Sequence, residues 1–433
     1  MALHMSTIIS RTASDILSQL SYIRPALSSH IPLFSISVSP NTKADELSAL
    51  VSHLTSQSSH GIGCLSASIP STDPTWQESI ACSVALFDKS MATPFRSTIP
   101  GINTPQVGRW HSFRKRSEDA DDELGDTANI NWDDIWSRKL GRGFLPPEIP
   151  TQDHEAVGTI VYFSDGAPEG LSNALHTLGS ATKVGLIASS TPFVTGRPFT
   201  LFHGTSIYSS GAVGLYLASS ARPRSYVEFP GLQKLTEPLT VTSSKGNLVH
   251  SLDNTNPSRL LLSAIEKSGS ASRRVTVRAP DANMKDDQYY LAALRRVGEQ
   301  YELHQLFTIM SGDPSRGTLA LGSDTAPSEG TPVQIYRLPA EFSPDTLARY
   351  LVDSKTSAPR KTCNVIFTVS PDVDHRSVPV VINESMETIV LDDVFIAASE
   401  NGFVVDDRVL GDGGDRPWRC TIRGGLFGLE WDR

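Results

Sequence analysis

Residues 158–217, GTIVYFSDGAPEGLSNALHTLGSATKVGLIASSTPFVTGRPFTLFHGTSIYSSGAVGLYL, are the stretch around which the chain is organised. An apolar strand leads through a Gly/Pro turn into a helix, and a second apolar strand follows. Small residues then introduce a hairpin over residues 201–217, broken around residues 209–211. This alternation predicts an α/β, or mixed α+β, protein.

Length and composition predict about two or three domains. A chain of 433 residues exceeds one typical domain, and 39% hydrophobic residues supply cores for more than one. Proline, arginine and glycine accumulate near residues 221–237, so we expect one domain over residues 31–230 and a second over residues 231–433.

Charge and cysteine usage exclude several protein classes. A net charge of −9 argues against a broad nucleic-acid surface, and no apolar run reaches the length of a membrane span. Four scattered cysteines with no Cys-x-x-Cys pair indicate buried free thiols in a reducing compartment. We therefore expect a cytoplasmic protein.

The N-terminal segment, residues 1–30, leaves two interpretations open. Ile8, Ile9, Ile16, Leu17 and Leu20 suit one face of a helix that packs on the domain. Its Ser/Thr richness and single acidic residue also resemble a mitochondrial targeting segment, and the beginning of the chain could instead be a cloning remnant.

A charged insertion, residues 89–155, interrupts the first domain. A basic triplet at residues 114–116 precedes six acidic residues between 118 and 126. The run is typical of a solvated insertion, or alternatively of an arm that docks a partner. Trp110, Trp132 and Trp136 are expected to anchor its ends.

Further elements follow from local patterns. A Ser-Pro-Asx turn ends both residues 34–41 and residues 366–372, an echo that a duplicated half or chance would explain. Helices are expected at 44–56, 171–178, 257–267, 286–299 and 343–352. Strands are expected at 33–38, 62–66, 80–87, 159–164, 184–191, 239–243, 248–249, 302–309, 317–321, 333–338, 365–369, 378–382 and 419–429.

Two groups of residues are candidate ligand sites, since none of the common catalytic or nucleotide-binding motifs occurs. In the first, small hydroxyl residues after a strand leave room for a ligand beside a titratable histidine. In the second, alternation places two arginines on one strand face, where they could bind a carboxylate or phosphate. The first group is Ser189, Ser190, Thr191, His203, Ser206 and Tyr208; the second is Arg419 and Arg423.

Six short motifs follow one another along the chain: GLIASS at 185–190, the hairpin at 202–217, PLTVT at 238–242, LDNTNPSR at 252–259, SGDPSRG at 311–317 and EGTPV at 329–333. Their order resembles the FIST family (F-box and intracellular signal transduction), as a FIST-N half followed by a FIST-C half over about residues 30–430. Residues 1–30 carry no F-box pattern, so the resemblance is to a eukaryotic or fungal type without one. Residues 398–403 match the bacterial Gly-Glu-Ile-Gly element only loosely.

The resemblance implies two packed domains, each with a mixed β-sheet flanked by helices. It also implies a non-enzymatic module that senses a small ligand, such as an amino acid, or recognises a protein partner in signalling or ubiquitin-linked regulation. It names no cofactor. The alternative is an enzyme of unrecognised class that uses Ser190 and His203, which requires these side chains to converge in one pocket. A third possibility is an interaction protein that works through the charged insertion.

Overall fold

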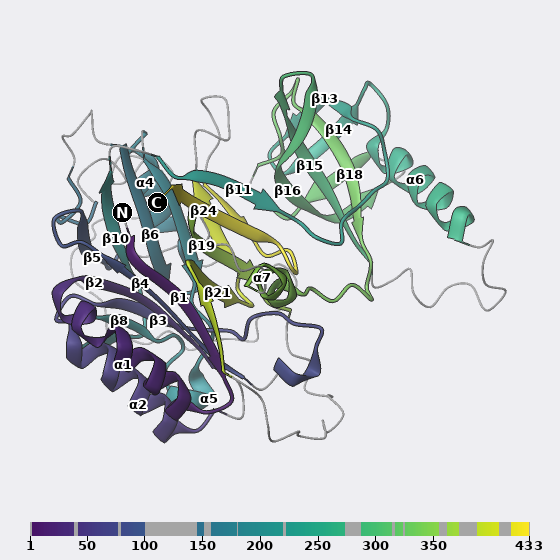
Figure 1. The fold of residues 1–433 in the computed structure, drawn as a ribbon. Helices are drawn as coiled ribbons and strands as arrows, with labels where there is room; N and C mark the ends of the chain where they lie inside the picture. Colours follow the sequence, from purple (N-terminus) through teal and green to yellow (C-terminus); the bar gives the residue numbers. More distant parts are fainter. Residues whose placement is uncertain are drawn as a thin grey trace, which may run out of the picture.

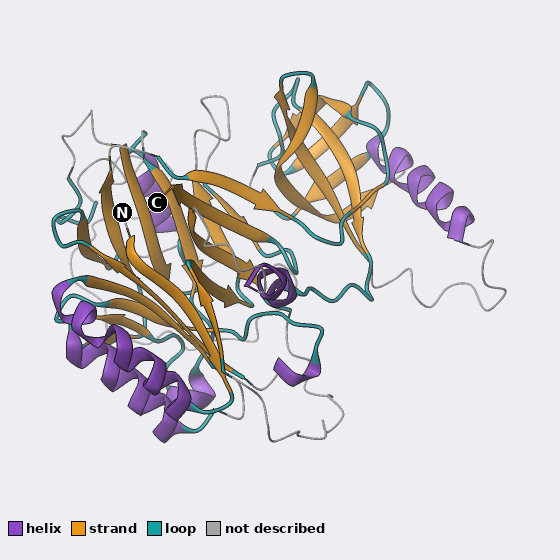
Figure 2. Ribbon diagram, viewed as in Figure 1, coloured by secondary structure: helices purple, strands orange, loops and turns teal. Residues whose placement is uncertain are grey.

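The computed structural model shows a mixed α+β chain in which strands predominate and a few helices flank the sheets, which confirms the expected fold class (Figures 1 and 2). In the part of the chain that it describes, no helix is long and apolar enough to cross a membrane. It describes residues 2–38, 42–76, 79–99, 145–150, 157–179, 181–219, 222–272, 287–313, 317–323, 325–354, 362–371, 388–406 and 417–432.

The first sheet contains a four-stranded unit, called unit 1, in the order β1-β4-β2-β3. β2 and β3 are parallel and joined by α2, whereas β4 runs antiparallel to both β2 and β1. α1 and α2 cover the outer face of this sheet (Figure 1), and their leucines pack in the hydrophobic cluster beneath them. The bounds are β1 Ala2–Ser10, α1 Ala13–Ser29, β2 Ile31–Ser37, α2 Ala44–Gln57, β3 Ile62–Ser66, the 3-10 helix Pro74–Trp76 and β4 Ile80–Phe87.

Two further units repeat this topology. Unit 2 has the order β5-β10-β6-β7 and unit 3 the order β11-β24-β19-β21. In each unit the first, fourth, second and third strands along the chain lie side by side, and the second and third strands are parallel. The bounds are β5 Ala92–Ser97, β6 Val157–Ser164, α4 Glu169–His176, β7 Thr182–Ile187, β10 Ala212–Ser219, β11 Arg224–Glu228, α7 Thr346–Ser354, β19 Thr362–Val369, β21 Val394–Ser399 and β24 Leu426–Asp432.

Short excursions between the third and fourth strands join the units into a ring. In unit 2 the excursion contributes β8, which pairs with β3 of unit 1. In unit 3 it contributes β22, which pairs with β7 of unit 2. Ala67 of unit 1 closes the ring through a bridge to Ala398 of unit 3. The remaining elements are α5 Pro192–Thr195, β8 Leu201–His203, β9 Ser206–Tyr208, β20 Ile389–Asp392, β22 Phe403–Asp406 and β23 Trp418–Cys420.

The inner faces of the three units share one hydrophobic core. Leu33, Val161 and Val365 stand at matching places on the three second strands, and all three are buried in the same cluster. The outer faces build separate clusters: one under α1 and α2, one under α4 and one under α7. The ring is therefore stabilised by burial at its centre and on each outer side.

Hydroxyl groups of unit 1 form hydrogen bonds with backbone groups at the edge of β21. The Thr7 hydroxyl donates to the carbonyl of Val394 at 2.8 Å and accepts from the Ile396 N–H at 3.0 Å. The Ser83 hydroxyl donates to the Ile396 carbonyl at 2.6 Å. A buried strand edge without partners would be costly, so these side chains seal units 1 and 3 together.

Aromatic rings pressed against glycines mark equivalent positions in the units. Phe34 pairs with Gly63 across β2 and β3, and Tyr162 pairs with Gly185 across β6 and β7. A Cβ on Gly63 would lie 2.4 Å from the Phe34 ring, and one on Gly185 would lie 2.2 Å from the Tyr162 ring. In unit 3 the same place holds the pair Ile366 and Ile396.

A barrel, β12 to β18, is inserted between the first and second strands of unit 3. β18 pairs with both β13 and β15, which closes the sheet. Figure 1 shows it projecting from the ring with α6 on its outer side. The bounds are β12 Gln233–Lys234, β13 Leu239–Lys245, β14 Leu248–Leu252, α6 Pro257–Ser272, β15 Gln288–Val297, β16 Gln300–Asp313, β17 Thr318–Leu321 and β18 Pro332–Leu338.

Two helix predictions need correction. The N-terminal helix is confirmed only for residues 13–29, where α1 carries Ile16, Leu17 and Leu20. Residues 2–10 form β1 between β4 and β20, with Ile8 and Ile9 buried in clusters on opposite faces, as alternation in a strand requires. Residues 288–297 form β15, because Gly298, at φ 64°, turns the chain into a long hairpin with β16. Both faces of β15 are buried, so its apolar residues imitate a helical pattern.

The hairpin predicted over residues 201–217 is shorter than expected. It comprises β8 and β9 alone, and it turns at Gly204, whose φ is 58°. β10 then leaves for the sheet of unit 2, where it lies between β5 and β6. The strand predicted over residues 419–429 is likewise two strands, β23 and β24, separated by a turn at Gly424.

The sheets are not divided near residue 230. β20 pairs with β1, and β22 pairs with β7, so strands from the last fifty residues complete sheets that begin in the first half. The start of the predicted insertion is also a strand, because β5 pairs with β10 and carries Pro94 at the edge of its sheet. The charge run, its three tryptophans and the strand at 378–382 lie outside the described residues.

Candidate functional site

The ends of the three parallel strand pairs meet where the units join. Gly63, Gly185 and Ile396 occupy equivalent places on the three third strands. Four residues after them lie Ala67, Ser189 and Glu400, respectively. The Ala67 N–H donates to the Ala398 carbonyl at 2.9 Å, and the Ser189 N–H donates to the Leu65 carbonyl at 3.1 Å. The carboxyl ends of parallel strands are a common place for ligands in α/β folds.

Glu400 joins unit 3 to unit 2 through its carboxylate. Oε2 accepts a hydrogen bond from the Ser189 hydroxyl at 2.7 Å, and Oε1 accepts one from the Ser190 N–H at 2.7 Å. The Asn401 side-chain amide donates to the same Oε1 at 3.1 Å. Bonds to an ionised carboxylate are about twice as strong as those between neutral groups, so Glu400 holds the end of β7 firmly.

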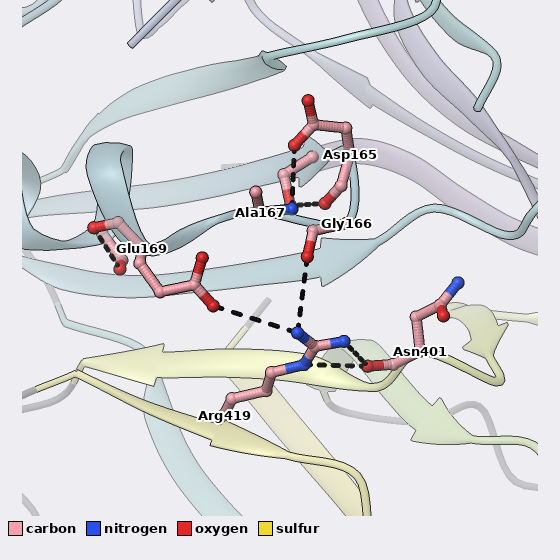
Figure 3. Close-up of polar contacts among 8 residues, drawn as sticks. Asp165, Gly166, Ala167, Glu169, Asn401 and Arg419 are labelled. Carbon is pink, nitrogen blue, oxygen red and sulfur yellow. Dashed lines mark hydrogen bonds and ion pairs between the residues drawn. The ribbon is translucent and has the colours of Figure 1, made fainter. Parts of the chain in front are cut away.

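Asn401 and Arg419 extend this contact toward unit 2 (Figure 3). The Asn401 side chain also donates to the Ala188 carbonyl at 3.1 Å. Arg419, on β23, donates from Nε and Nη2 to the Asn401 carbonyl at 3.2 and 3.0 Å. Its Nη1 reaches the Gly166 carbonyl at 3.4 Å and lies 3.9 Å from Glu169 Oε1.

The loop between β6 and α4 is preorganised by Asp165. Its Oδ1 accepts from the Ala167 N–H at 3.0 Å (Figure 3). Its Oδ2 accepts from the Gly211 N–H at 2.6 Å. The first of these bonds is an Asx turn, which fixes a short loop without regular structure. The Gly166 carbonyl is thereby held in place for Arg419.

A hydroxyl cluster fixes the loop that follows Ser190. The hydroxyls of Thr191, Thr195 and Thr200 lie within 2.8 to 3.2 Å of one another. Thr191 also donates to the Arg197 carbonyl at 3.0 Å. Because Thr191 and Thr200 are buried, this cluster anchors the loop from below, while Phe193 at its tip is fully exposed.

Comparison with known proteins gives one family. The FIST N domain model matches residues 33–255, which is just over half of the chain. The chain belongs to the FIST family. FIST domains are generally sensory domains of signal transduction and are thought to bind small ligands. No curated protein matches the chain.

The family match covers only part of the ring. It includes the second and third strands of units 1 and 2 and ends within the barrel at residue 255. Ser189 and Ser190 therefore lie inside the FIST N region, whereas Glu400, Asn401 and Arg419 lie beyond it. Residues from both parts of the chain build this one junction.

Burial shifts the pKa values of two side chains near the junction of units 2 and 3. It lowers the pKa of Arg419, and the nearby Glu169 carboxylate opposes that shift. Burial also raises the pKa of Tyr162, and the negative charges of Asp406 and Glu169 add to the effect. Within the described residues no group of three or more His, Cys, Asp or Glu side chains is placed to hold a metal ion.

The structure brings together three of the residues that the sequence singled out. Ser189 and Ser190 both contact Glu400, and Arg419 contacts its neighbour Asn401. Thr191 adjoins them but is buried in the hydroxyl cluster. Ligand binding by these residues stays a prediction, while their convergence is a feature of the fold.

His203 does not join this group. Thr200 stands beside the end of β3, where its carbonyl accepts from the Leu65 N–H at 3.0 Å, but His203 pairs with Ile62. Three strand residues separate these positions by about 10 Å. Since Ser206 pairs with His203 across the hairpin, it lies there too. The strand pairing therefore gives no support to the convergence that an enzyme using Ser190 and His203 requires.

Tyr208 and Arg423 belong to other contacts. Arg96 of β5 stacks over the Tyr208 ring with its guanidinium carbon 4.3 Å from the ring centroid. Arg423 lies beyond the end of β23 and donates to the carbonyls of Pro339 and Ala340 at 3.1 and 3.3 Å. The expected shared face for Arg419 and Arg423 is wrong, because the strand stops at Cys420.

Glu400 and Asn401 were missed as site residues. The sequence gives one usable signal, since three segments with small and hydroxyl residues end the third strands: CLSAS at 64–68, LIASS at 186–190 and AASEN at 397–401. Aligning them places Glu400 opposite Ala67 and Ser189. Only the pairing of β22 with β7 reveals that it reaches Ser190.

Proposed function

We propose that this FIST protein is a small-ligand sensor whose ligand binds at the junction of units 2 and 3. Glu400 is the charged anchor, with Ser189, Ser190 and Asn401 beside it. The carboxylate accepts three hydrogen bonds from described residues and has room for about one more. The proposal therefore favours a ligand that presents a hydrogen-bond donor, such as the ammonium group of an amino acid.

One comparison within the molecule supports this assignment. Ala67, Ser189 and Glu400 stand at equivalent places, yet only one of them carries a charge. The junction formed by Ala67 closes with backbone bonds alone, so a carboxylate is not needed to join two units. We therefore assign the Glu400 carboxylate, beside the exposed Ser190, to ligand binding rather than to ring closure.

We further infer that residues 31–230 and 231–433 correspond to a FIST-N and a FIST-C half. Under this assignment the FIST-C half supplies Glu400 and Arg419. The barrel, inserted in unit 3, also belongs to the FIST-C half. Ligand at the junction would then contact both halves. Such a contact offers a way to pass an occupancy signal to the barrel, which Arg423 ties to the ring.

The test compares thermal unfolding of the wild type, Glu400→Gln and the control Glu329→Gln. Glu329 is exposed in the barrel, so its substitution removes the same charge far from the junction. Each protein is heated with a panel of the twenty amino acids. A ligand at one hundred times its Kd stabilises the native state by about 2.7 kcal/mol.

We expect at least one amino acid to raise the Tm of the wild type and of Glu329→Gln but not of Glu400→Gln. Native mass spectrometry of protein purified from its own cells, with a denatured control, identifies a ligand outside the panel. An equal rise in Tm for Glu400→Gln places the ligand elsewhere and contradicts the proposal. A bare chain without any response favours recognition of a macromolecular partner.

A further inference from the structure

A buried ion pair joins units 2 and 3 away from the ligand junction. Lys183 of β7 and Asp406 of β22 pair across the two strands, with Nζ 3.0 Å from Oδ2. Their side chains are 1% and 4% exposed. His176 of α4 adds a contact from Nδ1 to both Asp406 oxygens at 3.2 Å.

The fold itself does not require this pair. Lys183 lies two residues before Gly185 of unit 2. The equivalent positions, two residues before Gly63 of unit 1 and Ile396 of unit 3, hold Gly61 and Val394. Neither is charged. Replacing a buried ion pair by apolar residues is often neutral or stabilising, so its retention calls for a reason other than stability.

The register of β22 provides that reason. Phe403 and Val405 are buried in the shared core, while Val404 and Asp406 alternate with them. A slip of two residues along β7 would keep every apolar side chain on its face, so hydrophobic patterning does not exclude it. The same slip would separate Lys183 from Asp406 and leave two buried charges unpaired.

Register at β22 decides where Glu400 lies. A tight turn connects them, in which the Gly402 N–H donates to the Ser399 carbonyl at 3.4 Å and Gly402 adopts a φ of 87°. The Ile187 N–H in turn donates to the Gly402 carbonyl at 3.0 Å. With so short a connection, displacement of β22 moves Glu400 away from Ser190.

We propose that Lys183 and Asp406 are positioning residues that lock β22 in register on β7 and so set Glu400 against Ser189 and Ser190. The inference rests on the proposed ligand site, which it deepens by naming what holds the site together. Its physical content, the position of Glu400, does not depend on any ligand. It can therefore fail or succeed separately from the proposed function.

The experiment measures amide hydrogen exchange in the full chain without ligand. The Ser190 N–H belongs to an exposed residue, and its bond is to Glu400, so its protection reports where Glu400 lies. The variants are Lys183→Met, Asp406→Leu, the double variant and Lys183→Arg, which keeps the cation. Glu400→Gln serves as the control that weakens the Ser190 bond without touching the ion pair.

In the double variant we expect a Tm close to that of the wild type but exchange at Ser190 and in β22 at least tenfold faster. Glu400→Gln should accelerate exchange at Ser190 alone, and Lys183→Arg should retain wild-type exchange at both places. A folded double variant with unchanged exchange overturns the inference. So does a Lys183→Arg variant that loses protection at Ser190 as fully as Lys183→Met, which covers the case of a double variant that does not fold.

Discussion

Substitution of Gly185 tests whether the units are built on one packing plan. Tyr162 is 1% exposed, and its ring fills the space beside Gly185, where an added Cβ would lie 2.2 Å from the nearest ring carbon. The ring lies in a buried cluster, and even at Gly214, its partner on the neighbouring strand, an added Cβ would lie 2.6 Å from the Tyr162 Cβ. Gly185→Ala therefore overpacks a full site.

The expected cost is about 1 kcal/mol of unfolding free energy, the difference between two opposing effects. Overpacking of a core costs about 1 to 3 kcal/mol, and the lower backbone entropy of alanine in the unfolded chain returns about 0.5 to 1 kcal/mol. Gly185→Ile should cost more. The double variant Tyr162→Ile/Gly185→Ile should recover most of the loss, because it copies the Ile366 and Ile396 pair of unit 3.

Urea unfolding followed by circular dichroism and by tryptophan fluorescence measures these differences, and agreement between the two probes checks for a single transition. Gly61→Ala is the matched control, since its nearest neighbour would be the Pro32 Cγ at 3.3 Å. A Gly185→Ala variant as stable as Gly61→Ala would refute the packing argument. A double variant no more stable than Gly185→Ile would refute the equivalence of units 2 and 3.

Two further predictions concern His203 and Arg423. Burial lowers the pKa of His203 from its usual 6.5, so the unfolded chain binds the proton more readily and stability falls as the pH drops below 6.5. Urea titrations at pH 7.5 and 5.5 should show a smaller difference for His203→Gln than for the wild type. Arg423→Ala removes two charged hydrogen bonds to the carbonyls of Pro339 and Ala340, so limited proteolysis should cut faster near residue 340. Unchanged cleavage there would show that the barrel is held by other contacts.

Local patterns predicted the elements that rest on local chemistry. The segments that became β2, α2, β3, β4, β6 and α4 all lie within a few residues of the predicted ranges. Their apolar residues recur at the strand or helix period, and turns rich in glycine, proline or serine bound them. The prediction for β15 failed because this strand is buried on both faces, which removes the alternation of apolar and polar residues that identifies a strand.

Sheet partners were beyond reach because they depend on residues far apart. β22 pairs with β7 across more than two hundred residues, and nothing near either segment specifies the other. The similar segments 34–41 and 366–372 occupy equivalent places in the fold, since they include the ends of β2 and β19, which are both second strands of a unit. Their similarity suggested two related halves, whereas the topology repeats three times.

The candidate site follows the same division. Ser189 and Ser190 were recognisable because small hydroxyl residues end an apolar strand, a purely local pattern. Glu400 could be recognised only from the ring, where β22 of unit 3 pairs with β7 of unit 2 and brings Glu400 to Ser190. His203 was chosen for its chemistry and its proximity along the chain, but a hairpin carries it about 10 Å along the neighbouring strand.

Ring closure also explains why the site joins two distant parts of the chain. Each unit donates an excursion to the unit before it, so every junction combines residues from two units. At the junction of units 2 and 3, the FIST N region supplies the hydroxyls and the C-terminal strands supply the carboxylate. A ligand held there would add a further link between two segments that the pairing of β22 with β7 already joins. Occupancy would therefore stabilise ring closure itself, which is the property that a sensory domain needs to report a small molecule.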